Sequence, residues 1–140
     1  MNVFCKLSII FFTLFGETKP SNIGQTGCPY DKKLKAYTSV DKLPEYPGGM
    51  SAYGRFFINN FKANDTIKFQ SNIRVAFVVL LNGSLSKLTI PQKSKKEYTT
   101  FDKEALRVLK LMPKWKPGTC NGKVVPVYMQ MPRVILEPQG

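Results

Sequence analysis

The stretch NIRVAFVVLLNGSLSKLTI, residues 72–90, decides the fold because it is the clearest strand pair in the chain. Large apolar residues occupy every second position of its first half, which is typical of a strand with one face against a core. Asn82-Gly83 then supplies the strongest short-range signal for a hairpin turn. Residues 72–81 and 84–90 are therefore predicted to pair antiparallel, and the first strand turns these side chains inward: Ile73, Val75, Phe77, Val79 and Leu81.

A helix is predicted on each side of this hairpin. Ahead of it, SAYGRFFINNFK (51–62) carries aromatic residues at i, i+3, i+4 and i+8, which share one helical face, and Ser51 is a suitable N-cap. Behind it, FDKEALRVLKLM (101–112) follows a second N-cap, Thr100, and ends at Pro113 because the residue before a proline resists the α conformation. The inward faces are predicted to contain Tyr53, Phe56, Phe57, Phe61, Phe101, Ala105, Leu109 and Met112.

The last predicted element is a strand in KVVPVYMQMPRVIL (123–136), in which Pro126 and Pro132 indicate a sheet edge because proline cannot donate to a ladder. The element order predicts an α+β fold, a two-layer sandwich of an antiparallel three-stranded sheet and two helices. Residues 36–40 (AYTSV) have enough β character to add an N-terminal strand. The last strand is predicted to turn Val125, Val127, Met129 and Met131 inward.

The N-terminus indicates export. Lys6 precedes the apolar run from Leu7 to Gly16, which is too short for a membrane-spanning helix of about 20 residues but suits a secretory signal. The alternative is a buried N-terminal helix. We expect residues 1–18 to be a signal peptide, 19–35 a flexible segment and 36–137 the folded domain.

Cys28 and Cys120 are expected to form a disulfide, because removal of the leader takes Cys5 with it and two cysteines in an exported chain usually pair. Closing so long a loop stabilises the folded state by at most about 4–5 kcal/mol in the chain-entropy description. Two cysteines without any histidine are a poor ligand set for a metal.

The chain's only tryptophan lies in LMPKWKPG (111–118), and three interpretations compete for it. Trp115 stacks on a ligand, reads a nucleic-acid base, or packs into the core. Pro117 and Gly118 favour the third interpretation, because with Pro113 they fix a rigid crossover between the second helix and the last strand. A base-stacking surface needs several aromatic residues on one exposed face.

Charge and composition restrict the classes of function. The chain has 21 Lys and Arg against 9 Asp and Glu, and its net charge of +12 attracts nucleic acid, anionic lipid or an acidic protein surface. It contains no histidine, which excludes the Ser-His-Asp and Cys-His nucleophile systems. We therefore expect no enzymatic activity, no cofactor and no small-molecule substrate.

Four segments of the chain form a recognisable combination: PEYPGG (44–49), IRVAFVVLLNGSLSKLTI (73–90), DKEALRVLKLMPKWKPG (102–118) and NGKVVPVYMQMP (121–132). Together they resemble the TonB C-terminal domain family. The resemblance covers roughly residues 36–136. It implies structural roles for four residues in these motifs: Trp115, Pro117, Gly118 and Gly122.

The resemblance also implies a way of binding. Domains of this family are periplasmic and contact an outer-membrane transporter, whose short TonB box adds as a strand beside the last strand of the domain. Carried over, the docking strand is Lys123 to Met131. Its outward row, set by the parity of Pro126 and Pro132, consists of Val124, Pro126, Tyr128 and Gln130. The two prolines shorten such an edge, or they protect it against aggregation.

The expected function is a non-catalytic periplasmic protein-binding module in transport across the outer membrane. The expected partner is an acidic segment of an outer-membrane transporter or of another periplasmic protein, with an edge-paired dimer as a variant. Full-length transducers of the family carry a membrane helix and a Pro-rich spacer, and the sequence here offers neither at sufficient length. The alternative is a basic domain that binds nucleic acid or an anionic surface. Export argues against nucleic acid.

Overall fold

The structure is a computed structural model that describes residues 27–62 and 73–131. The predicted leader and Pro132 lie outside these ranges. The elements in chain order are β1 (Tyr30–Asp31), β2 (Ala36–Tyr37), α1 (Gly49–Asn60), β3 (Ala76–Val79), β4 (Leu85–Thr89), the 3-10 helix η1 (Lys95–Glu97), α2 (Thr100–Lys110), β5 (Thr119–Cys120), β6 (Lys123–Val124) and β7 (Val127–Gln130).

The main sheet is larger than predicted. It has five strands in the order β1-β2-β7-β3-β4, and β5 and β6 form a separate two-stranded sheet. The antiparallel unit β7-β3-β4 corresponds to the predicted three strands. The predicted three-stranded antiparallel sheet is incomplete: β2, which lies within the predicted extra strand 36–40, adds to β7 in parallel and brings β1 with it. The fold class α+β with two helices is confirmed.

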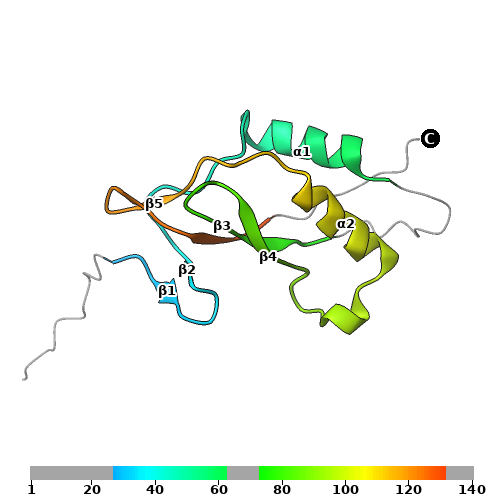
Figure 1. Ribbon diagram of the computed structural model, residues 1–140, viewed down its shortest axis with the longest axis horizontal. Coiled ribbons are helices and arrows are strands. Elements are labelled where there is room, and N and C mark those ends of the chain that lie inside the picture. Colours follow the sequence, from blue (N-terminus) through cyan, green and yellow to red (C-terminus); the bar gives the residue numbers. More distant parts are fainter. Residues whose placement is uncertain (1–26, 63–72, 132–140) are drawn as a thin grey trace, which may run out of the picture.

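Both helices pack on one core with the helix-facing side of β3 (Figure 1). The predicted inward row of the first hairpin strand is correct from Ile73 to Val79, whereas Leu81 is 57% exposed because it lies in the turn. The hydrophobic effect on this face is the main stabilising contribution to the fold. The fully buried members include Phe57, Val75, Phe77, Val79, Ala105, Val108 and Leu109.

Both helix starts differ from the prediction. The N-cap of α1 is Gly48, in the left-handed conformation at φ 85°, and Ser51 lies inside the helix. The N-cap of α2 is Thr99, whose side chain accepts from the amide of Asp102 while the Asp102 carboxylate accepts from the amide of Thr99. This reciprocal pair explains why the N-cap is Thr99 and the helix begins at Thr100, one residue earlier than predicted.

The hairpin turn between β3 and β4 is docked onto the crossover that follows α2. The amide of Trp115 donates to the carbonyl of Gly83 (2.8 Å). A Cβ atom at Gly83, where φ is 81°, would lie 2.0 Å from the carbonyl oxygen of Trp115. Glycine is therefore needed here for both conformation and space.

The N-terminal hairpin β1–β2 forms one end of the sheet, at the lower left of Figure 1, whereas α1 lies at the top of that view. Its turn is bound to β4 by Lys87, whose Nζ donates to the carbonyls of Lys33 (3.0 Å) and Leu34 (2.6 Å). Residues 27–35, the described part of the predicted flexible segment 19–35, thus contain β1 and a hydrogen-bonded turn.

Candidate partner-binding edge

The inner edge of β7 pairs with β3, as predicted from the hairpin. The register places Val127 opposite Val79 and Gln130 opposite Ala76. The amide of Met131 donates to the carbonyl of Val75 (2.9 Å), which fixes the phase of the ladder. Since bonded residues alternate in an antiparallel pair, the main chain of Val127, Met129 and Met131 faces β3. The main chain of Tyr128 and Gln130 therefore faces outward.

The same alternation continues toward the N-terminal side of β7. The amide of Val125 donates to Gly118 in the β5 direction (3.1 Å), so the main chain of Val124 faces away from β5. The carbonyl of Pro126 accepts from the amide of Tyr37 in β2 (2.8 Å). Of the four predicted edge residues, Pro126, Tyr128 and Gln130 thus turn their main chain to the outer side of β7, and Val124 turns its main chain away from β5.

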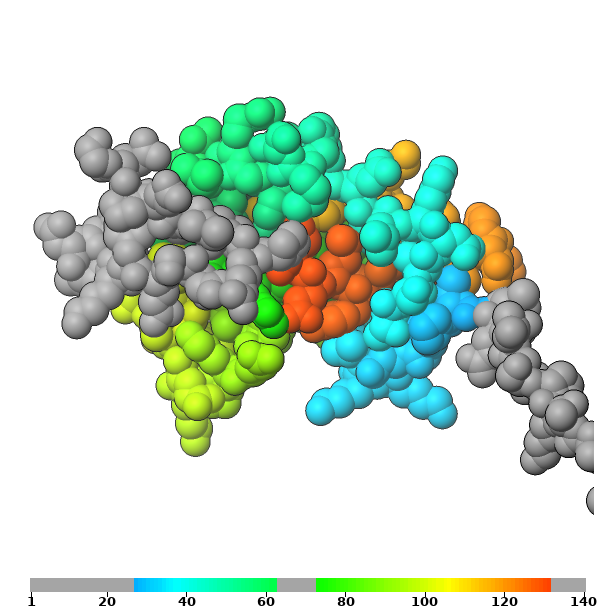
Figure 2. Space-filling model, turned by 180° about the vertical axis from the view of Figure 1, so that it is seen from behind, coloured from blue at the N-terminus to red at the C-terminus, as the bar shows by residue number. Residues whose placement is uncertain are grey.

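These four residues do not form one free edge strand. Residues 123–131 are divided between β6 and β7, which belong to different sheets, because the chain leaves the ladder at Val125-Pro126. In addition, β7 is the middle strand of the five, since Tyr37 pairs with Val127 in parallel. Figure 2 shows the orange-red atoms of this region at the surface beside the cyan N-terminal segment.

The outer edge is covered only in its middle. In the described part of the chain, no strand pairs with the outer side of Val124 or of Gln130. Val124 is 48% exposed, and Gln130 is also exposed. The docking edge that the sequence predicted is therefore interrupted by β2, with an uncovered residue on each side of it.

An apolar cluster lies beneath this covered part of the edge. Val127 is fully buried there, with Cys120 and Val125 beside it. Tyr37 packs against the cluster from β2, and the ring of Tyr30 meets that of Tyr37 edge-on with 5.1 Å between centroids. β2 is thus held by side-chain packing as well as by its main chain.

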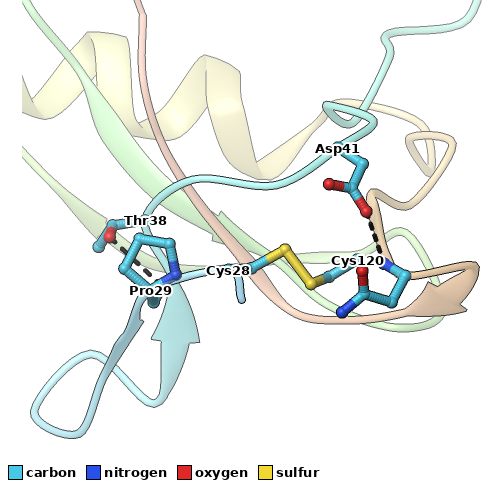
Figure 3. Close-up of a disulfide and its surroundings, with 6 residues drawn as sticks. Cys28, Pro29, Thr38, Asp41 and Cys120 are labelled. Carbon is cyan, nitrogen blue, oxygen red and sulfur yellow. Dashed lines mark hydrogen bonds between the residues drawn. A yellow bond between two sulfur atoms is a disulfide. The ribbon is translucent and has the colours of Figure 1, made fainter. Parts of the chain in front are cut away.

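The predicted disulfide between Cys28 and Cys120 is present (Figure 3). It attaches the N-terminal segment to β5, and the adjacent amide of Asn121 donates to the carboxylate of Asp41 (2.6 Å). Asn121 and Gly122 both have positive φ, 50° and 74°, as a tight two-residue hairpin turn between β5 and β6 requires. Gly122 therefore acts through its backbone conformation.

The cysteine sulfurs and the Asp41 carboxylate lie within 4.8 Å of one another, close enough to suggest a metal site. Metal binding by cysteine requires the thiolate, however, and both sulfurs are engaged in the disulfide. The arrangement is therefore a covalent anchor in this state.

Trp115 lies in the core, 2% exposed, against Tyr46, Tyr53 and Phe77 at centroid distances of 5.4, 5.9 and 5.2 Å. Burial also raises the pKa of Tyr53, whose hydroxyl lies in this aromatic cluster. The side chain cannot reach a ligand at the surface. Its place in the structure is that of a packing residue.

The crossover that carries Trp115 is bound on its other side to residues 42–45, which run into the PEYPGG segment. Lys42 and Thr119 exchange two main-chain hydrogen bonds, and so do Glu45 and Lys116. A Cβ atom at Gly118 would lie 2.7 Å from Val127 and 2.8 Å from the carbonyl of Lys42, so this glycine permits close approach. Pro117 is half-buried beside it. Sequence reasoning did not anticipate this ribbon, because its pairs join residues more than seventy positions apart.

Together the fold and the edge define a small, disulfide-anchored α+β domain whose last strand carries β2 on the middle of its outer side and leaves Gln130 uncovered. No helix in residues 27–62 or 73–131 has the length and apolar character needed to span a membrane. The family described as Gram-negative bacterial TonB protein C-terminal matches residues 65–134, half of the chain. The chain belongs to this family, which consists of non-catalytic protein-interaction domains of the cell envelope.

The family match begins after α1 and includes the β3–β4 hairpin, α2 and the strands β5 to β7. It does not include the PEYPGG segment or β1 and β2. No curated protein and no solved structure matches the chain.

Proposed function

We propose that the protein is a periplasmic binding module that takes up an extended segment of a partner protein by strand addition at the outer side of residues 123–131, as part of transport across the outer membrane. The observation that carries the proposal is the parallel pairing of Tyr37 with Val127. This pair supports the proposal, because the outer side of β7 already bonds a strand of this chain. In strand addition the main-chain hydrogen bonds provide affinity and the alternate side chains provide specificity.

The proposed partner segment is acidic. Each of the six carboxylates in the described residues already meets a donor of the protein itself: Asp31, Asp41, Glu45, Glu97, Asp102 and Glu104. The excess of lysine therefore remains for a partner. We expect binding to weaken with salt, because exposed charges are screened within about 10 Å at 0.1 M ionic strength.

Site-specific photo-crosslinking in the native cell envelope tests the proposal. A photoreactive amino acid at Gln130 samples the uncovered part of the edge. The matched control is Ile58, which is 53% exposed on α1 and is not part of the predicted edge. We expect the Gln130 probe to capture the periplasmic segment of an outer-membrane transporter, with a yield that falls as salt is raised, and the Ile58 probe to capture none.

Equal capture at both positions would contradict edge docking and favour attraction by the basic surface as a whole. A Gln130 product that joins two copies of this chain would instead identify an edge-paired dimer. The absence of any Gln130 product in cells that contain the transporters would refute the proposed function.

A further inference from the structure

We infer that residues 28–40 are a resident strand segment: β2 occupies the middle of the docking edge in place of the partner, and docking requires β2 to leave. That a partner strand competes with β2 for this edge rests on the proposed function. That β2 lies on the edge rests on contacts within this chain.

The first contact is made by the main chain. The amide of Tyr37 donates to the carbonyl of Pro126 (2.8 Å), and Tyr37 pairs in parallel with Val127. A parallel pair is bonded through the residues that flank the paired residue, so Tyr128 lies at this contact as well. Two of the four outward residues, Pro126 and Tyr128, are therefore not accessible to a partner strand while β2 is in place.

The second contact is made by side chains. Ala36 is fully buried, and Tyr37 packs on the cluster of Cys120, Val125 and Val127. The site under β2 thus fits an extended segment with a small residue followed by an aromatic one. A partner strand that replaces β2 in the same direction has to satisfy this pattern.

β2 is tethered on both sides, which raises its local concentration at the edge. Ahead of it, Cys28 is bonded to Cys120 in β5. Behind it, Lys42 exchanges hydrogen bonds of 3.1 and 3.0 Å with Thr119. Short tethers of this kind give effective concentrations of about the millimolar order, which a free partner has to exceed in binding strength.

The contact is also small enough to be exchanged. β2 and β7 share one residue pair, whereas β3 and β7 share four. A single main-chain pair contributes little net free energy because the unpaired groups bond to water instead. The resident strand therefore delays and selects partners without closing the edge permanently.

Amide hydrogen exchange on the full-length mature protein tests the occupancy directly. Tyr37→Pro removes the donor to Pro126, and Tyr37→Phe is the matched control that keeps the amide and the ring. We expect the Tyr128 amide to exchange about fivefold to tenfold faster in Tyr37→Pro, as the loss of one net hydrogen bond implies. The Met129 amide faces β3 and should keep its rate. An unchanged Tyr128 rate in an otherwise intact fold would overturn the inference.

If the Met129 amide also exchanges faster, Tyr37→Pro loosens the whole sheet. In that case the inference is tested on the wild-type protein in dithiothreitol. The reagent donates two electrons and two protons, converting Cys28 and Cys120 to thiols while it closes its own ring disulfide. β2 then keeps only the Lys42 tether, so we expect a Tyr128 rate between those of the oxidised protein and Tyr37→Pro. A Tyr128 rate equal to that of the oxidised protein would overturn the inference.

Competition is tested by combining Tyr37→Pro with the Gln130 photo-crosslinking probe. We expect a higher yield of the transporter product than in Tyr37→Phe. If exchange responds but the yield does not, β2 covers the edge without competing and the inference fails. If exchange responds and no product forms in any variant, the proposed function fails while the occupancy stands. If product forms and exchange does not respond, the proposed function stands and the resident strand is refuted.

Discussion

At the scale of single residues, the carbonyl of Trp115 leaves room for a hydrogen atom at Gly83 and nothing larger. The added methyl group of Gly83→Ala would meet that oxygen at 2.0 Å, at a φ of 81° that alanine resists. The strain and the overlap together should lower the free energy of unfolding by about 3 kcal/mol or more. Urea unfolding followed by the fluorescence of Trp115, the only tryptophan, measures this loss.

Two other glycines are matched controls for Gly83→Ala. Gly122 has a φ of 74° but open space around it, so Gly122→Ala should cost only the conformational strain of about 1–2 kcal/mol. Gly54 lies inside α1 with nothing within 4 Å, so Gly54→Ala should stabilise the helix by about 0.5–1 kcal/mol. Equal losses at Gly83 and Gly122 would show that the contact with Trp115 contributes nothing.

At the scale of elements, Glu104 and Arg107 tie α2 to the end of α1. Glu104 accepts from the amide of Lys62 (2.8 Å) and from Arg107, and Arg107 donates to the carbonyl of Asn60 (2.6 Å). The hydrogen bond from Arg107, ahead of the bond from Lys62, lowers the pKa of Glu104 below its ordinary value of 4.5. The ionised carboxylate is therefore the form that joins the two helices.

This pair predicts a pH dependence of stability. Since the folded pKa is lowered, the contribution of Glu104 is complete above the ordinary carboxyl pKa and is lost as the pH falls through the folded value. Glu104→Gln should reduce the free energy of unfolding by about 1 kcal/mol at pH 7. The difference from wild type should shrink as the pH is lowered below the ordinary carboxyl value of 4.5, as urea unfolding at pH 7 and in acid measures.

Glu97→Gln is the matched control for this prediction. The pKa of Glu97 is also lowered, by its bonds to Ser94, but these bonds close only the short helix η1 and join no second element. We expect a smaller loss at pH 7 than for Glu104→Gln. A larger loss would place the pH sensitivity in η1 rather than between the helices.

The elements that the sequence predicted correctly are those with local signals. The Asn82-Gly83 turn identified the hairpin, and aromatic spacing identified the buried face of α1 around Tyr53 and Phe57. The parallel pairing of Tyr37 with Val127 has no comparable signal, since it is one contact between residues ninety positions apart. The outward parity of Val124, Pro126, Tyr128 and Gln130 could be predicted from two prolines. That the chain itself covers the middle of this row could not.

At the scale of the whole molecule, the disulfide between Cys28 and Cys120 joins residues 92 positions apart. In the chain-entropy description, such a loop contributes up to about 4–5 kcal/mol by restricting the unfolded state. The double variant Cys28→Ser, Cys120→Ser should therefore unfold at a clearly lower urea concentration than the oxidised wild type. In dithiothreitol the two proteins should unfold alike. A difference that persists after reduction would show that the serine side chains, and not the lost bond, cause the effect.

The position of this bond also determines how the domain would carry a mechanical load. A pulling force applied to the chain ahead of residue 28 passes from Cys28 through the sulfur bridge to Cys120, at the start of the ribbon that leads into β7. Residues 29–41 lie off that path and carry no tension. The hydrogen bond from Tyr37 to Pro126 is thus shielded from force in the oxidised protein, whereas in the reduced protein the same pull would act on β1 and β2 directly and peel them from the sheet.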